Sequence, residues 1–174
     1  MRPLGPTDLK RLHRTWRRRT EGRVALLLDS VQTPANVGSI LRTAAAYRVE
    51  HLWLAGATAS PSSAGTQRTA MGTSRYLTWT EVATGEEAVA EAKGDGWTVV
   101  GVELADGAVP LHELTLGPAV CLAVGHEDRG LSPGVLAACD RVGFLPLLGR
   151  VGSLNVATAA ALAVYEARRQ EWGR

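Results

Sequence analysis

Short apolar runs alternate with helical patterns along this chain, and the alternation limits the folds open to it. The runs expected to form strands are residues 24–31, 51–57, 97–104, 119–125 and 141–147. Helical patterns are expected at residues 33–47, 84–94, 132–139 and 153–172. Residues 58–75, rich in Ser, Thr and Gly, are expected to form a long loop with at most one helical turn. Strands that alternate with helices predict an α/β fold around a mostly parallel sheet.

Charge is distributed unevenly along the 174 residues, a length that favours one folded domain. Residues 1–23 hold eight of the 19 basic and two of the 17 acidic residues, which leaves 11 basic and 15 acidic residues in the remainder. We therefore expect a basic arm, residues 1–22, ahead of a domain over residues 23–174. A basic arm on an acidic body favours a polyanionic partner such as nucleic acid. A solvated, partly disordered tail is the alternative.

Several classes of protein are disfavoured by what the sequence lacks. Cys121 and Cys139 stand 18 residues apart without a C-x-x-C or a matching His pair, so neither a disulfide framework nor a metal site is expected. No apolar run reaches the ~18 residues of a membrane span and no signal-peptide pattern is visible, so a cytoplasmic protein without membrane contact is expected. The chain has no G-x-G-x-x-G after its first strand, no P-loop and no G-x-S-x-G, which argues against Rossmann enzymes and serine hydrolases.

Ligands of parallel sheets bind beyond the carboxyl ends of the strands, so the loops after the strand-like runs are the candidate sites. In the loop after the first strand-like run, residues 24–31, Thr33 is placed to cap a helix that has Pro34 at its first position. Gly38 costs that helix about 1 kcal/mol relative to Ala, and Arg42 lies one turn later on the same face. The space beside Gly38 would let a bulky partner approach the backbone and meet a guanidinium. An exposed Arg in a surface salt bridge is the alternative.

A second segment follows the strand-like run at residues 119–125. Gly125 and Gly130 bound a tight loop that carries Glu127 and Arg129. Two glycines so close together allow the backbone to approach a ligand closely, and Glu127 can accept hydrogen bonds from a ligand or from a neighbouring loop. A solvated turn with charged tips would have the same pattern.

The third segment joins the last strand-like run to the last helix. Its strand breaks at Pro146, and a loop containing Gly149 and Gly152 follows. Ser153 is expected to open the Ala-rich helix with a capping hydroxyl, and Asn155 adds a side-chain amide beside the free backbone N–H groups of the helix start. An ordinary strand-to-helix connection is the alternative for this segment alone.

Taken together, the three segments resemble the SPOUT superfamily of methyltransferases, and within it the TrmH-like ribose 2′-O-methyltransferases of tRNA and rRNA. The first family motif stands here as Asn36, Gly38 and Arg42. The second stands as Gly125, Glu127, Gly130 and Leu131. The third stands as Pro146, Gly149, Ser153, Leu154, Asn155 and Val156. The resemblance covers roughly residues 23–172.

The resemblance implies a C-terminal trefoil knot, a homodimer and S-adenosyl-L-methionine as the cofactor. It also implies that the catalytic residues are Arg42, Asn36, Glu127, Ser153 and Asn155. The residues it places at the cofactor are Val102, Glu103, Gly125, Leu145, Pro146, Leu147, Ser153 and Leu154. Arg42 is interpreted as the group that binds the ribose alkoxide and the adjacent phosphate, because a guanidinium keeps its proton and is a poor general base.

The expected partner is tRNA or rRNA, and tRNA is favoured because an extra N-terminal domain found in some rRNA-directed relatives is missing. In the arm, Trp16 is interleaved with cations, a pattern that favours contacts to phosphates and stacking on a base. The expected RNA-binding residues are Arg11, Arg14, Trp16, Arg17, Arg18, Arg19, Arg42, Arg68 and Arg129. The alternative function is that of a non-catalytic RNA-binding or assembly factor on a SPOUT scaffold, which measurable cofactor binding would exclude.

Overall fold

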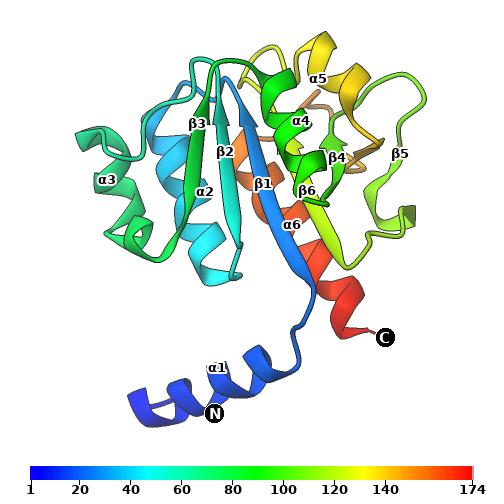
Figure 1. Ribbon diagram of the computed structural model, residues 1–174. Helices are drawn as coiled ribbons and strands as arrows, with labels where there is room; N and C mark the ends of the chain where they lie inside the picture. Colours follow the sequence, from blue (N-terminus) through cyan, green and yellow to red (C-terminus); the bar gives the residue numbers. More distant parts are fainter. Residues whose placement is uncertain (174) are drawn as a thin grey trace.

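Seven parallel strands form a single sheet in the computed structural model, which describes residues 1–173 (Figure 1). Their order across the sheet is β3-β2-β1-β6-β4-β7-β5, and every neighbouring pair is parallel. The strands are β1 (Arg23–Asp29), β2 (His51–Ala55), β3 (Trp79–Val82), β4 (Thr98–Val102), β5 (Val109–Pro110), β6 (Ala119–Val124) and β7 (Arg141–Phe144). The predicted α/β fold is confirmed, and all five expected strand runs are present. The two strands at the edges of the sheet, β3 and β5, were not predicted.

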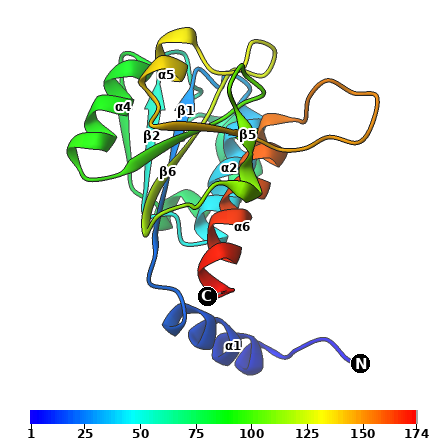
Figure 2. The same cartoon turned by 90° about the vertical axis from the view of Figure 1, so that its right-hand side faces the viewer.

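Helices cover both faces of the sheet (Figures 1 and 2). The helices are α1 (Pro6–Arg18), α2 (Pro34–Ala46), α3 (Ala64–Ala70), α4 (Gly85–Gly94), α5 (Pro133–Ala138) and α6 (Val156–Trp172), with short 3₁₀ turns at Thr73–Tyr76 and Leu111–Glu113. One core packs under α2 and α6 and the other under α4 and α5, and successive residues of β1 alternate between them. Leu26 and Leu28 belong to the first core, and Ala25 and Leu27 to the second. Among residues 1–173, no helix has the length and apolar character needed to cross a bilayer.

The segment over residues 58–75 contains more structure than a loop. It holds α3 and the 3₁₀ turn Thr73–Tyr76, and α3 packs directly against α2. A Cβ placed on Gly38 would lie 2.6 Å from the carbonyl oxygen of Thr66 and 2.7 Å from Cβ of Thr69. The expectation that Gly38 leaves room for an outside partner is therefore wrong, because α3 fills that space.

Replacing Gly38 by Ala is expected to destabilise the protein by about 1–2 kcal/mol. The gain of about 1 kcal/mol in helix propensity is outweighed by forcing α2 and α3 apart. The free energy of unfolding in urea measures the effect. Gly94→Ala is the matched control, because a Cβ on this helical glycine meets nothing within 4 Å. Equal stabilisation by both substitutions would contradict this packing role.

The basic arm is helical, which was not predicted, and α1 extends below the body of the molecule (Figures 1 and 2). Its contacts with the body are few and lie at its end. The ring of Trp16 lies 5.0 Å from that of Trp172, and the carboxylate of Glu171 accepts hydrogen bonds from the backbone N–H groups of Glu21 and Gly22. The end of α6 therefore holds the connection between the arm and β1.

Candidate active site

Three segments far apart in the sequence meet at the carboxyl end of the sheet through one chain of side-chain hydrogen bonds. The amide nitrogen of Asn155 donates to the amide oxygen of Asn36 at 2.9 Å. The amide nitrogen of Asn36 then donates to Oε1 of Glu127 at 2.9 Å. Each of the three predicted segments contributes one of these residues, so the structure brings together three of the five residues expected to be catalytic.

Asn155 also determines where the last helix begins. Its Oδ1 accepts hydrogen bonds from the backbone N–H groups of Ala157 at 2.9 Å and of Thr158 at 3.3 Å, and α6 starts at Val156. The expectation that Ser153 caps this helix is therefore wrong, because Ser153 lies two residues before the cap, exposed in the preceding loop. The expected side-chain cap by Thr33 is also absent: α2 does begin at Pro34, but Thr33 makes no capping hydrogen bond.

The carboxylate of Glu127 is held as an anion. Partial burial raises its pKa, but hydrogen bonds from the Asn36 amide and the backbone N–H of Thr33, at 2.9 Å each, outweigh burial and lower the pKa to about 2. A third hydrogen bond comes from the backbone N–H of Gln32 at 3.2 Å. Glu127 is therefore a fixed acceptor that orients the start of α2, and it is a poor general base at neutral pH.

Replacing Glu127 by Gln is expected to remove a pH-dependent part of the stability. A carboxyl with a lowered pKa stabilises the folded state above its unfolded pKa of about 4.3, and this contribution is lost as the pH falls toward about 2. The difference in unfolding free energy between wild type and Glu127→Gln should therefore shrink between pH 5 and pH 2. Asp106→Asn, in an exposed turn, is the control. A difference that stays constant with pH would contradict this account.

The glycines of the second segment serve the fold of their own loop. A Cβ on Gly125 would lie 2.1 Å from the carbonyl carbon of Gly130, because the loop folds back on itself through a bridge between His126 and Gly130. Gly130 has a φ of 66°, and Glu103 holds the loop by accepting a hydrogen bond from the backbone N–H of Leu131 at 3.0 Å. The Cβ position of Gly125 is therefore taken by the backbone of the same loop and that of Gly130 by the side chain of Glu103, so both glycines are needed for the loop to pack.

A cavity of about 100 Å³ lies beside this loop, between the ends of β4 and β7 and the segment that leads to α6. Its lining includes six of the eight residues expected at the cofactor: Val102, Glu103, Leu145, Leu147, Ser153 and Leu154. Gly125 and Pro146 do not line it. Sequence reasoning missed Leu104, Phe144, Gly152 and Ala159, which neighbour predicted residues or lie one helical turn beyond them.

The remaining predicted residues lie apart from this hydrogen-bond chain. Arg42 is exposed on α2, and its guanidinium donates to Sδ of Met71 at 2.9 Å. Arg68 on α3 and Arg129 in the second loop are exposed as well. Asp29 was not proposed for a role, yet this buried carboxylate at the end of β1 accepts a hydrogen bond from the backbone N–H of Ser132 at 2.8 Å. The sequence does contain a signal for Asp29, because it is an acidic residue at the end of an apolar run.

The amino-acid sequence matches a known family. The family model described as the SpoU rRNA Methylase family matches residues 23–165. The chain belongs to this family. The SpoU match begins at the first residue of β1 and leaves the basic arm outside it.

Two relatives of the chain are named for different RNAs. The chain is 32% identical over 170 residues to the tRNA (guanosine(18)-2′-O)-methyltransferase of Escherichia coli (strain K12), covering 96% of this chain and 72% of the relative. It is 36% identical over 146 residues to the 23S rRNA (guanosine(2553)-2′-O)-methyltransferase of Bacillus subtilis (strain 168), covering 84% of this chain and 58% of the relative.

A solved structure, that of an S-adenosylmethionine-bound rRNA methyltransferase from Sinorhizobium meliloti, superposes with a TM-score of 0.80. It is 33% identical, and the match covers 86% of this chain and 57% of that chain. The chain therefore spans a little over half the length of these rRNA-directed relatives, and more of the tRNA-directed one.

Proposed function

We propose that this chain transfers a methyl group from S-adenosyl-L-methionine to a ribose 2′-hydroxyl of tRNA or rRNA. The observation that carries the proposal is the hydrogen-bond chain from Glu127 through Asn36 to Asn155, which joins the three segments of the family resemblance beside the cavity. Membership of the SpoU family and relatives named as 2′-O-methyltransferases support the same reaction.

The residues that line the cavity have the chemical character that a site for this cofactor needs. Its walls combine apolar residues such as Leu145 and Leu154 with the polar residues Glu103 and Ser153, the mixture that small-molecule sites use. Sites for such molecules hold at least ~300 Å³, so the cavity of about 100 Å³ must widen to admit it. A Cβ on Gly149 or Gly152 meets nothing within 4 Å, and Figure 2 shows the segment before α6 projecting from the body, so no neighbouring group packs against these two glycines at the mouth of the cavity.

Once bound, the cofactor supplies a methyl group on a positively charged sulfur. The residues of the chain must then hold the ribose hydroxyl in line with it and stabilise the developing alkoxide. Arg42 suits the second task, because its guanidinium is always charged and its fork can bind the alkoxide and the neighbouring phosphate together. Glu127 is already an anion committed to three hydrogen bonds, so in our proposal the proton leaves through that phosphate.

We further propose that the protein works as a cytoplasmic homodimer with a knotted C-terminal region. Exposed Leu162 and Tyr165 lie on α6, which packs beside α2 on one face of the sheet, and they supply apolar surface for a second copy. Arg42, exposed on the same layer, would then serve the cavity of its own chain or of the partner. The division into an arm over residues 1–22 and a catalytic domain over residues 23–174 belongs to the same proposal.

A methyl-transfer assay with tritiated S-adenosylmethionine on total tRNA and on rRNA tests the function. Incorporation into one pool, resistant to alkali at one linkage, is the expected result, and tRNA is the favoured pool. The match to a tRNA-directed relative over 96% of this chain, arm included, supports that preference. Absence of both incorporation and calorimetric cofactor binding would overturn the proposal in favour of a non-catalytic scaffold.

Deleting residues 1–19 is expected to weaken RNA binding and to reduce its dependence on salt. All seven Lys and Arg residues of the arm lie in this segment, and each phosphate contact that is lost lowers the slope of log K against log salt by about 0.7–0.9. Cofactor affinity should not change, because the cavity lies at the other end of the sheet. An unchanged salt slope in filter-binding measurements would remove the arm from the RNA interface.

A further inference from the structure

A second, larger hollow lies between the arm and the body. It has a volume of about 860 Å³ and is bounded by α1, the end of α2, the 3₁₀ turn Thr73–Tyr76 and the end of α6. We name it the arm groove. It lies at the amino-terminal edge of the sheet, whereas the candidate active site lies at the carboxyl edge. Because β1 has seven residues, the two sites are about 20 Å apart along the strand direction.

The arm groove is basic. Its lining includes His13, Arg17, Arg48 and Arg168, and no Asp or Glu is among its lining residues. Arg168 is 2% exposed and has a structural role, because its guanidinium donates to the backbone carbonyls of Gly22, Tyr47 and Arg48. Arg17 and Arg48 are exposed and have no acidic hydrogen-bond partner within residues 1–173, and His13 is exposed beside them. They are therefore available to an anionic ligand.

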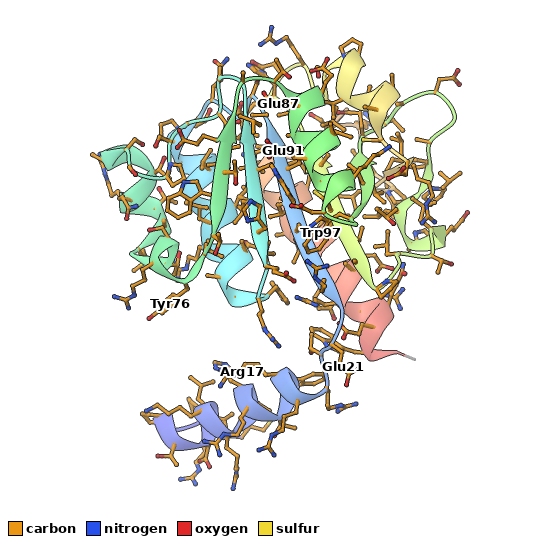
Figure 3. The ribbon with its side chains drawn as sticks, in the orientation of Figure 1. Arg17, Glu21, Tyr76, Glu87, Glu91 and Trp97 are labelled. Carbon is orange, nitrogen blue, oxygen red and sulfur yellow. The ribbon has the colours of Figure 1, made fainter. Side chains whose placement is uncertain are left out.

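Aromatic rings form much of the remaining wall. Trp16 and Trp172 pack against each other where α1 meets α6, and Trp16 remains 39% exposed. Tyr76 stands across the groove from α1 with 67% of its surface exposed. Figure 3 shows Arg17 on α1 and Tyr76 on the lower edge of the body, on opposite sides of this space. Exposed rings beside unpaired cations are the combination that single-stranded nucleic acid needs, for stacking of bases and for neutralisation of phosphates.

The groove is also held in shape before any ligand arrives. Glu171 accepts hydrogen bonds from the backbone at Glu21 and Gly22, and Arg168 donates to Oε2 of Glu171 at 3.3 Å. The side chain of Trp172 donates to Oγ1 of Thr20 at 2.9 Å. These contacts fix the point at which the arm leaves the body. The end of α6 therefore positions α1, which forms the opposite wall of the groove.

We propose that the arm groove binds a single-stranded segment of the RNA substrate, remote from the nucleotide that reacts. This inference rests on the proposed function in that it takes RNA as the substrate. Bases stack on Tyr76 and Trp16 while phosphates meet Arg17 and Arg48. The enzyme then contacts its RNA at both edges of the sheet, and an RNA too short to span them loses the second contact.

The test uses an octauridylate that carries 4-thiouridine, in photocrosslinking and in fluorescence binding titrations with the full chain. Crosslinks are expected in the peptides that contain Trp16 and Tyr76. Tyr76→Ala should weaken binding by at least about fivefold, because one stacked base is lost. Arg17→Glu should weaken it more than Arg18→Glu, an identical change of charge on a neighbouring arm residue that does not line the groove.

Other outcomes would overturn the inference. Equal losses in Arg17→Glu and Arg18→Glu, or crosslinks confined to the carboxyl edge of the sheet, would mean that only the net charge of the arm matters. If Tyr76→Ala shifted the sedimentation coefficient but left oligonucleotide affinity unchanged, the groove would hold a second copy of the chain. Failure of the proposed methyl transfer is separable, because oligonucleotide binding and crosslinking need no cofactor and no reaction.

Discussion

Replacing Arg42 by Ala is expected to lower the rate of methyl transfer at saturating substrates by about 10²–10³-fold, with no loss of stability. Removal of one fixed donor from a developing oxyanion has an effect of this size. The side chain is exposed and its hydrogen bond is to the sulfur of Met71, so the fold does not depend on it. Single-turnover methylation, cofactor calorimetry and thermal unfolding together separate chemistry from binding and folding.

The matched control is Arg68→Ala, another exposed cation on the neighbouring helix α3. Its loss should raise the RNA concentration needed for half-maximal rate and leave the maximal rate nearly unchanged. Arg42→Lys should remain at least about tenfold below wild type, because an ammonium lacks the planar fork of donors. Near-full activity of Arg42→Lys, or equal losses of maximal rate in Arg42→Ala and Arg68→Ala, would reduce Arg42 to a general phosphate contact.

The central part of the fold could be predicted because its strands are buried on both faces and read as continuous apolar runs. The edge strand β3 is short and only partly buried, so no such run marks it. The helix α3 is short and polar, and what positions it is contact with Gly38, a residue far from it in the sequence. The helix α1 was overlooked although Leu9, Leu12 and Trp16 stand at helical spacing, because its charges dominate the segment.

The site residues could be proposed one by one, but not their connections. Asn36 and Glu127 are 91 residues apart, and Asn36 and Asn155 are 119 apart, so no local pattern reports that they touch. The same limit explains why Ser153 was assigned the cap: Ser and Asn are both strong N-cap residues. The structure selects Asn155, whose second polar atom reaches Asn36.

Replacing Asn155 by Ala is expected to cost about 2 kcal/mol of stability and to reduce methyl transfer by about 100-fold. The loss of the α6 cap costs about 1 kcal/mol, and the loss of the exposed hydrogen bond to the amide oxygen of Asn36 costs up to about 1 kcal/mol more. The rate falls because Asn36 and the start of α2 lose their connection to α6, and a displacement of about 1 Å of a positioning group can cost 100-fold. Urea unfolding and single-turnover methylation measure the two effects.

Asn155→Asp separates the two roles of this side chain. The new carboxylate keeps the capping oxygen, and its charge is favourable at a helix N-terminus, so stability should stay within about 1 kcal/mol of wild type. It has no donor for Asn36, because the amide oxygen of Asn36 would face an acceptor while its amide nitrogen donates to Glu127 on the other side. We therefore expect the rate of Asn155→Asp to fall as far as that of Asn155→Ala while the stable fold is retained. Wild-type activity in Asn155→Asp would show that the Asn36 connection is dispensable, and the cap alone would then explain why an asparagine stands there.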